Sequence, residues 1–169
     1  MNLNNFYSKP LKKEETSANT PAVSKKIITI IALISFLGFL DASYLAAKYY
    51  LGGPIPCAIL DGCDTVTTSQ YATMAGVPVA LLGAIYYLII FVLAISYLES
   101  KKDNLVFLIS RLTIVGFLAS LWFVYLQVFV LKALCLYCLF SAFTSTTLFI
   151  VSIIFLWRHR HLQKIFFIV

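Results

Sequence analysis

Apolar side chains fill four long runs of the sequence, at residues 27–50, 77–98, 105–133 and 135–157. Each run is apolar around its full circumference, which excludes a simple amphipathic helix at a water interface. About 20 apolar residues at a rise of 1.5 Å each cross a hydrocarbon core about 30 Å thick. Because backbone polar groups need hydrogen-bond partners inside lipid, runs of this kind are expected to be helical. The pattern predicts an all-α membrane protein, a bundle of four transmembrane helices.

Polar residues gather in the intervals and at the two ends. Residues 1–26 are mixed and polar, and predict a disordered cytoplasmic tail. Residues 27–157 form the membrane domain, and residues 158–169 a short basic cytoplasmic tail. We detect no cleavage site of a signal peptide, so the first apolar run is expected to remain in the protein.

The interval of residues 51–76 is the long external loop of the predicted bundle. Glycines and prolines at its start break the first helix. A short helical piece is expected after them, capped by Asp64 or Thr65 and ended by Gly76, lying over the membrane surface. The bundle therefore has an extracytoplasmic capping loop with a short helix.

Composition supports a membrane protein, and the charges suggest its orientation. The chain is 61% hydrophobic and 12% charged, against roughly 25% charged in soluble domains. The net charge of +6 comes mostly from basic residues that precede the first run, follow the second or follow the fourth. Lys and Arg in short loops mark the cytoplasmic face, so both termini are predicted inside and the opposite helix ends outside. The basic bias thus reflects topology, and a nucleic-acid partner is not expected.

The four cysteines are the strongest chemical signal. Cys57 and Cys63 lie in the long loop, and Cys135 and Cys138 form a C-x-x-C at the start of the fourth run. All four fall on the predicted external side, where an oxidising compartment permits disulfides. Three interpretations compete: structural disulfides or small apolar packing residues, a four-cysteine zinc site, and a thiol–disulfide relay. The C-x5-C spacing of the loop pair disfavours zinc.

The position of Cys135 favours the relay. It is expected at the first turn of the fourth helix, where free N–H groups and the helix dipole stabilise a thiolate. Cys138 lies one turn deeper on the same face. Electrons passed inward need an acceptor, and the sequence carries no haem, flavin or metal-cluster motif. A lipid-soluble quinone, either ubiquinone or menaquinone, fits an apolar bundle. Asp41 and Gln127 are further polar residues inside the runs, each with a pocket role or a hydrogen bond between helices as the alternatives.

These features together resemble the vitamin K epoxide reductase family, in its bacterial branch. The resemblance covers about residues 27–157 and rests on the spacing of Cys57 and Cys63, on the stretch SQYATMAGVPVALLGAIYY, and on the CLYC motif that opens the fourth run. It implies a four-helix bundle around a quinone, capped by the loop that carries the first cysteine pair.

The resemblance also implies roles for single residues. Cys57 and Cys63 are the shuttle pair, which takes electrons from a thioredoxin-like partner. Cys63 then forms a transient disulfide with Cys135, and Cys138 lies next to the quinone ring. Ser69 matches a serine of the capping segment near that ring. Asp64, beside Cys63, is a further candidate for the quinone site, as is Gln127 of the third run.

Two positions depart from the animal enzymes of the family. Ala142 stands where they have a tyrosine, and Val79 where they have a quinone-bonding asparagine. Both departures argue against reduction of vitamin K epoxide and leave plain quinone reduction. No room remains before Val169 for a fused thioredoxin-like domain, so a separate thioredoxin-like or DsbA-like partner is expected.

The function predicted from the sequence is a membrane thiol–quinone oxidoreductase that supports disulfide formation. It is expected in a bacterial inner or plasma membrane, with its cysteine pairs outside. The alternative is a non-enzymatic four-span scaffold whose loops are held by structural disulfides. A small transporter is a weaker rival, since matched broken helices and paired intramembrane charges are lacking.

Overall fold

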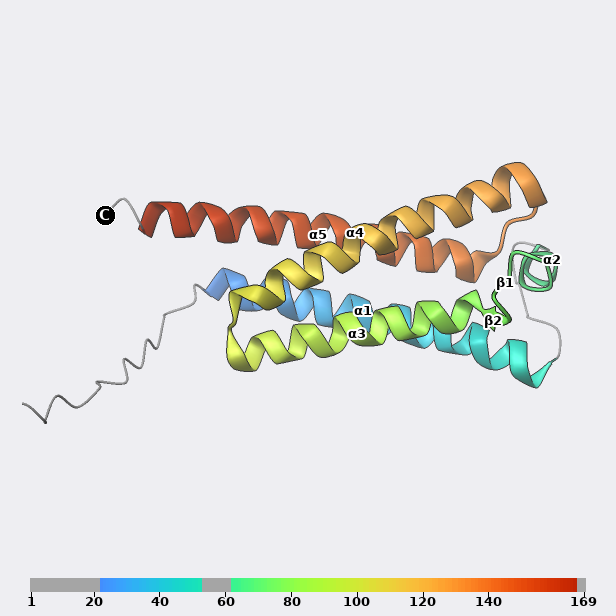
Figure 1. The fold of residues 1–169 in the computed structure, drawn as a ribbon, viewed down its shortest axis with the longest axis horizontal. Helices are drawn as coiled ribbons and strands as arrows, with labels where there is room; N and C mark the ends of the chain where they lie inside the picture. Colours follow the sequence, from blue (N-terminus) through green and yellow to red (C-terminus); the bar gives the residue numbers. More distant parts are fainter. Residues whose placement is uncertain (1–21, 53–61, 167–169) are drawn as a thin grey trace, which may run out of the picture.

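The computed structural model describes residues 22–52 and 62–166. Within these residues the chain is built of four long helices and a small cap at one end of them (Figure 1). The long helices are α1 (Ala22–Leu51), α3 (Val79–Ser100), α4 (Asp103–Tyr125) and α5 (Leu136–Phe166). All four are long and apolar enough to cross a membrane. The predicted all-α membrane bundle is confirmed.

The third spanning segment changes its winding before it ends. A π-helical turn, η1 (Leu126–Leu131), continues α4 without a break. It ends at Lys132, which adopts a left-handed backbone with φ of 50°. The backbone N–H of Lys132 donates to the carbonyl oxygen of Gln127 five residues earlier, as a π-helix requires. Segments of this kind are often found at functional sites.

The cap consists of α2 (Cys63–Thr67) and two short strands, β1 (Thr73–Met74) and β2 (Val77–Pro78). The strands are antiparallel, and Ala75 and Gly76 between them both have positive φ, as a tight hairpin turn needs. The start predicted for the short helix was wrong: α2 begins at Cys63, after Gly62, and no side chain caps it. The cap lies beside the start of α5 and the end of η1 (Figure 1).

Tyr87 of α3 is the largest of the fully buried side chains in the described part of the chain. Its ring is buried among aliphatic side chains of the other long helices. Its hydroxyl group donates to the backbone oxygen of Ser141 over 2.7 Å and lies 2.8 Å from the hydroxyl of Thr144. Gly38 of α1 leaves the space that the ring occupies, since a β-carbon there would lie 2.5 Å from it. These contacts join α1, α3 and α5.

The helices extend beyond the apolar runs at the end away from the cap. The start of α1 at Ala22 falls inside the expected polar tail, which otherwise lies outside the described residues. At the other terminus α5 continues to Phe166, through most of the expected basic tail. The start of α1 and the end of α5 both lie at the end opposite the cap (Figure 1).

Candidate redox site

Cys135 immediately precedes α5, and its sulfur caps the helix. Its backbone oxygen accepts the first helical hydrogen bond, from the N–H of Leu139 over 3.0 Å. Its sulfur accepts a bond from the backbone N–H of Cys138 over 3.4 Å. A side-chain acceptor at this position satisfies one of the free N–H groups of the first turn. The C-x-x-C spacing therefore places the first sulfur at the positive end of the helix.

This position makes Cys135 an acidic thiol. The hydrogen bond from the Cys138 side chain lowers the pKa of Cys135 to about 7, with help from the backbone N–H groups of Cys138 and Tyr137. Burial and the negative charge of Asp41 act in the opposite direction and raise this pKa. Because the thiolate is the nucleophile in disulfide exchange, a pKa near neutrality leaves a large reactive fraction at pH 7.

A second hydrogen bond fixes the backbone of Cys135. The backbone N–H of Cys135 donates to the side-chain oxygen of Gln127 over 2.9 Å. The backbone oxygen of Gln127 also accepts from the N–H of Ala133 over 3.1 Å. Gln127 is buried, so these bonds lie away from water. Of the two roles weighed for Gln127, hydrogen bonding within the protein is the one observed, and its partner is the backbone of the C-x-x-C motif.

Cys63 approaches Cys135 from the cap. Both sulfur-bearing residues are fully buried in one cluster with Leu45 of α1 and Val66 of α2. The approach depends on Gly62, because a β-carbon there would lie 2.7 Å from the backbone nitrogen and oxygen of Leu134. The cap and the turn before α5 are thus in backbone contact beside the two cysteines.

The cysteines of the site are in different redox states. Cys63 is disulfide-bonded, whereas Cys135 and Cys138 are free thiols. The transient Cys63–Cys135 disulfide is therefore absent from this state, as is a Cys135–Cys138 bridge. Cys57, the expected partner of Cys63, lies outside the described residues.

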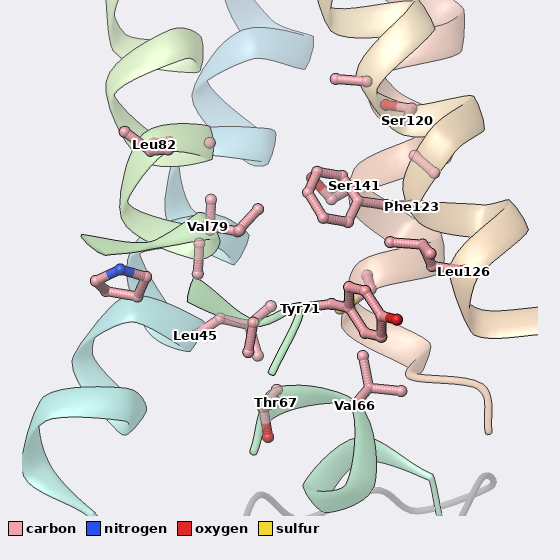
Figure 2. A pocket seen from close by; sticks show the side chains of 18 of the residues that line it. Leu45, Val66, Thr67, Tyr71, Val79, Leu82, Ser120, Phe123, Leu126 and Ser141 are labelled. Carbon is pink, nitrogen blue, oxygen red and sulfur yellow. The ribbon is translucent and has the colours of Figure 1, made fainter. Parts of the chain in front are cut away.

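A cavity of about 360 Å³ opens beside Cys138, between the cap and α3, α4 and α5. Val79 of α3 faces Phe123 of α4 across it, and Val66 and Thr67 of α2 lie at its cap end (Figure 2). Its volume falls in the range of small-molecule sites, about 300–1,000 Å³. Its walls are mostly apolar, which suits a ligand that partitions from lipid.

Only some of the residues predicted for a quinone site line this cavity. Cys138, Ser69 and Gln127 line it. Asp64 is exposed on α2 and is not among the described residues that line the cavity. Asp41 is partly buried on α1, and its Oδ2 atom is enclosed without a hydrogen-bond partner.

Sequence reasoning missed several polar residues of the cavity wall. These are Tyr71 in the cap, Tyr86 and Tyr87 of α3, and Ser141 and Ser145 of α5. The serines could have been found, because they follow Cys138 by three and seven residues and so share its helix face. The tyrosines could not, since aromatic residues are common throughout membrane helices.

Fold and site together define a class of protein. It is a four-helix membrane bundle in which a dithiol at a helix start lies between a disulfide-bearing cap and an apolar cavity. The chain belongs to the vitamin K epoxide reductase family, whose model matches residues 29–153. The resemblance to this family is confirmed.

The chain is also similar in sequence to a plant protein. The chain is 34% identical over 122 residues to the Arabidopsis thaliana protein "Thiol-disulfide oxidoreductase LTO1". The match covers 68% of this chain and 32% of the relative. The chain thus matches about a third of the length of that protein.

Proposed function

We propose that this protein is a membrane thiol oxidoreductase that oxidises a dithiol partner and reduces a quinone. The observation that carries the proposal is the order of groups along the site. Cys63 and Cys135 share one buried cluster, Cys138 packs against that cluster, and Cys138 also lines the cavity. The thiols therefore connect the cap to an apolar binding space. The name of the plant relative agrees with thiol–disulfide chemistry.

The electron balance of the proposed cycle starts from the state observed. With Cys135 and Cys138 reduced, the two thiols form a disulfide, and two electrons and two protons pass to a quinone, which leaves as quinol. Cys138 is the proposed donor because it lines the cavity. An acceptor of higher potential than the partner dithiol drives the transfer, and each 30 mV of two-electron difference is worth about 1.4 kcal/mol.

Regeneration of the dithiol uses the cap. A partner dithiol reduces the Cys57–Cys63 pair by exchange, and the Cys63 thiolate then attacks the sulfur of Cys135. That attack forms the Cys63–Cys135 disulfide and releases the Cys138 thiolate. A second exchange, by Cys57 on Cys63, frees Cys135 again. The burial of Cys63 beside Cys135 supports this choice of sulfur.

The cavity fits a quinone better than a polar substrate. Most of its wall is apolar, while a few hydroxyl groups and one thiol interrupt it. When bound, the quinone supplies a two-electron acceptor. The residues of the chain would hold its ring, exclude water and bring Cys138 to its edge. We propose ubiquinone or menaquinone as the natural compound, and a separate thioredoxin-like or DsbA-like protein as the dithiol partner.

The basic residues at the end of the bundle away from the cap support a sidedness. That end is proposed to face the cytoplasm of a bacterial cell, with the cap and both cysteine pairs outside. An oxidising compartment on the cap side would maintain the disulfide of the loop.

The test is quinol formation by the purified protein with a reduced thioredoxin-like protein and 2-methyl-1,4-naphthoquinone. We expect turnover in the wild type and none in Cys138→Ser, because the thiol at the cavity is missing. Val92→Ala, an exposed position on α3 outside the cavity wall, is the matched control and is expected to turn over normally. Absence of turnover in the wild type would contradict the proposal and favour the scaffold.

A further inference from the structure

Three buried side-chain oxygens in the described part of the chain have no hydrogen-bond partner: Asp41 Oδ2, Tyr86 Oη and Ser145 Oγ. Native proteins leave few such groups, because a buried hydroxyl without a partner destabilises the fold. Tyr86 and Ser145 both line the cavity beside Cys138, whereas Asp41 is not among its wall residues. Two of the three unpaired oxygens thus belong to one binding space.

The two hydroxyl groups belong to different helices, and that of Tyr86 also contacts a third helix, α4. Tyr86 belongs to α3 and Ser145 to α5. The Tyr86 hydroxyl lies against Gly116 of α4, where a β-carbon would overlap it. Gly116 therefore provides the space in which this hydroxyl sits. Ser145 is only 2% exposed, which leaves its hydroxyl no access to bulk water.

Several neighbouring polar groups of the cavity wall already make hydrogen bonds within the protein. Ser69 Oγ donates to the backbone oxygen of Val66 over 2.8 Å, and Thr67 Oγ1 to that of Cys63 over 2.8 Å. The Tyr87 hydroxyl donates to Ser141. Tyr86 and Ser145 differ from these residues, because their hydroxyls lie near each other but neither completes a hydrogen bond to another described group. A ligand in the cavity that carries a hydrogen-bond acceptor would pair with these hydroxyl groups.

Ser145 lies at a distance from Cys138 that suits the far side of a quinone ring. Ser145 follows Cys138 by seven residues, about two turns or roughly 10 Å along the axis of α5. Its side chain leans back toward the start of the helix, and so toward Cys138. A ring whose edge touches the Cys138 sulfur would extend its opposite oxygen toward the two hydroxyl groups.

We propose that the Tyr86 and Ser145 hydroxyls donate hydrogen bonds to one carbonyl oxygen of the quinone, the one farther from Cys138. This inference rests on the proposed function and specifies the ligand as a ring with carbonyl groups at both ends. A carbonyl oxygen offers lone pairs and no hydrogen, which matches two donors. As electrons enter the ring, negative charge grows on this oxygen, and preorganised donors stabilise it.

The test uses the full chain in lipid nanodiscs and two conservative variants, Tyr86→Phe and Ser145→Ala. The first readout is the dissociation constant of 2-methyl-1,4-naphthoquinone, measured on protein with both cysteine pairs oxidised, so that no turnover occurs. Loss of one neutral hydrogen bond is expected to raise this constant about five- to tenfold in each variant. Tyr125→Phe, an exposed tyrosine outside the cavity wall, is the control and is expected to bind like the wild type.

The second readout is the melting temperature without ligand. Removal of an unpaired hydroxyl is expected to leave it unchanged or to raise it in Tyr86→Phe and Ser145→Ala. Tyr87→Phe provides the contrast, because it removes a hydroxyl that is bonded to Ser141 and Thr144, and it is expected to melt lower.

The outcomes separate this inference from the function on which it rests. If the wild type binds and reduces the quinone while both variants bind it equally well, the assigned donors are wrong and the function stands. A lower melting temperature in Tyr86→Phe or Ser145→Ala would reveal a partner within the protein and would also overturn the assignment. If the wild type neither binds nor reduces the quinone, the proposed function fails and this inference fails with it.

Discussion

The side-chain oxygen of Gln127 accepts a 2.9 Å hydrogen bond from the backbone N–H of Cys135. Gln127 lies in the π-helical turn that ends the third spanning segment, and Cys135 immediately precedes α5, the fourth. The bond joins two consecutive helices across the turn of residues 132–134. It therefore sets where the acidic sulfur lies relative to both the cap and the cavity.

Replacement of Gln127 by Leu should weaken this junction. The buried N–H of Cys135 would lose its acceptor, at a cost of about 1–3 kcal/mol in the free energy of unfolding. The apparent pKa of Cys135 should also rise, because its sulfur would no longer be held over the helix start. Thermal unfolding and the pH dependence of Cys135 alkylation by a small reagent measure the two effects.

Ser152→Ala is the matched control for Gln127→Leu. Its hydroxyl lies 3.2 Å from that of Ser110, a buried pair between α5 and α4 away from the thiols. This variant should lose stability and keep the pH profile of Cys135. If Gln127→Leu behaved in the same way, the positioning role of Gln127 would be refuted.

Cys138→Ala should make Cys135 a weaker acid. The Cys138 thiol is the largest cause that lowers the pKa of Cys135 to about 7. Without it the pKa should rise toward the usual value of about 8.5, so the thiolate fraction at pH 7 falls from about one half to about 3%. Thiolate absorbance near 240 nm during a pH titration follows this change. Cys138→Ser keeps a donor and should shift the titration less; equal curves for the two variants would contradict the assignment.

Asp41→Asn should act on the same thiol in the opposite direction. The negative charge of Asp41 raises the pKa of Cys135, so its removal should lower that pKa and increase the thiolate fraction at neutral pH. The same titration of absorbance measures it. An upward shift would indicate that Asp41 supports the thiolate through contacts other than its charge.

Gly62→Ala should separate the cap from the start of α5. The added carbon would lie 2.7 Å from backbone atoms of Leu134, and an overlap with backbone has no easy relief. Stability should fall by about 1–3 kcal/mol. In a Cys57→Ala/Cys138→Ala background, the yield of the Cys63–Cys135 disulfide, measured by non-reducing mass spectrometry, should also fall.

Gly52→Ala serves as the control for that experiment. Gly52 has a φ of 70°, and a β-carbon there meets nothing within 4 Å. Its replacement should cost about 1 kcal/mol through backbone strain and leave the disulfide yield unchanged. An unchanged yield in Gly62→Ala would show that the close backbone contact does not control the approach of Cys63 to Cys135.

The sequence alone determined the membrane class, the four long helices and the position of the C-x-x-C pair at the start of the fourth helix. Apolar runs and the CLYC spacing are local properties, since helix length and the face shared by residues three apart follow from the geometry of one helix. The end of η1 and the start of α2 were less predictable. The left-handed backbone of Lys132 ends η1, and α2 begins at Cys63 after Gly62, which packs against the backbone of Leu134.

The tertiary structure decided which polar groups find partners. Tyr86 and Tyr87 are adjacent and chemically identical, but successive residues point about 100° apart on a helix. Tyr87 therefore reaches Ser141 and Thr144, while the Tyr86 hydroxyl rests unpaired against Gly116 at the cavity wall. Such differences depend on what the neighbouring helices present at each position, and that information is not contained in the local order of residues.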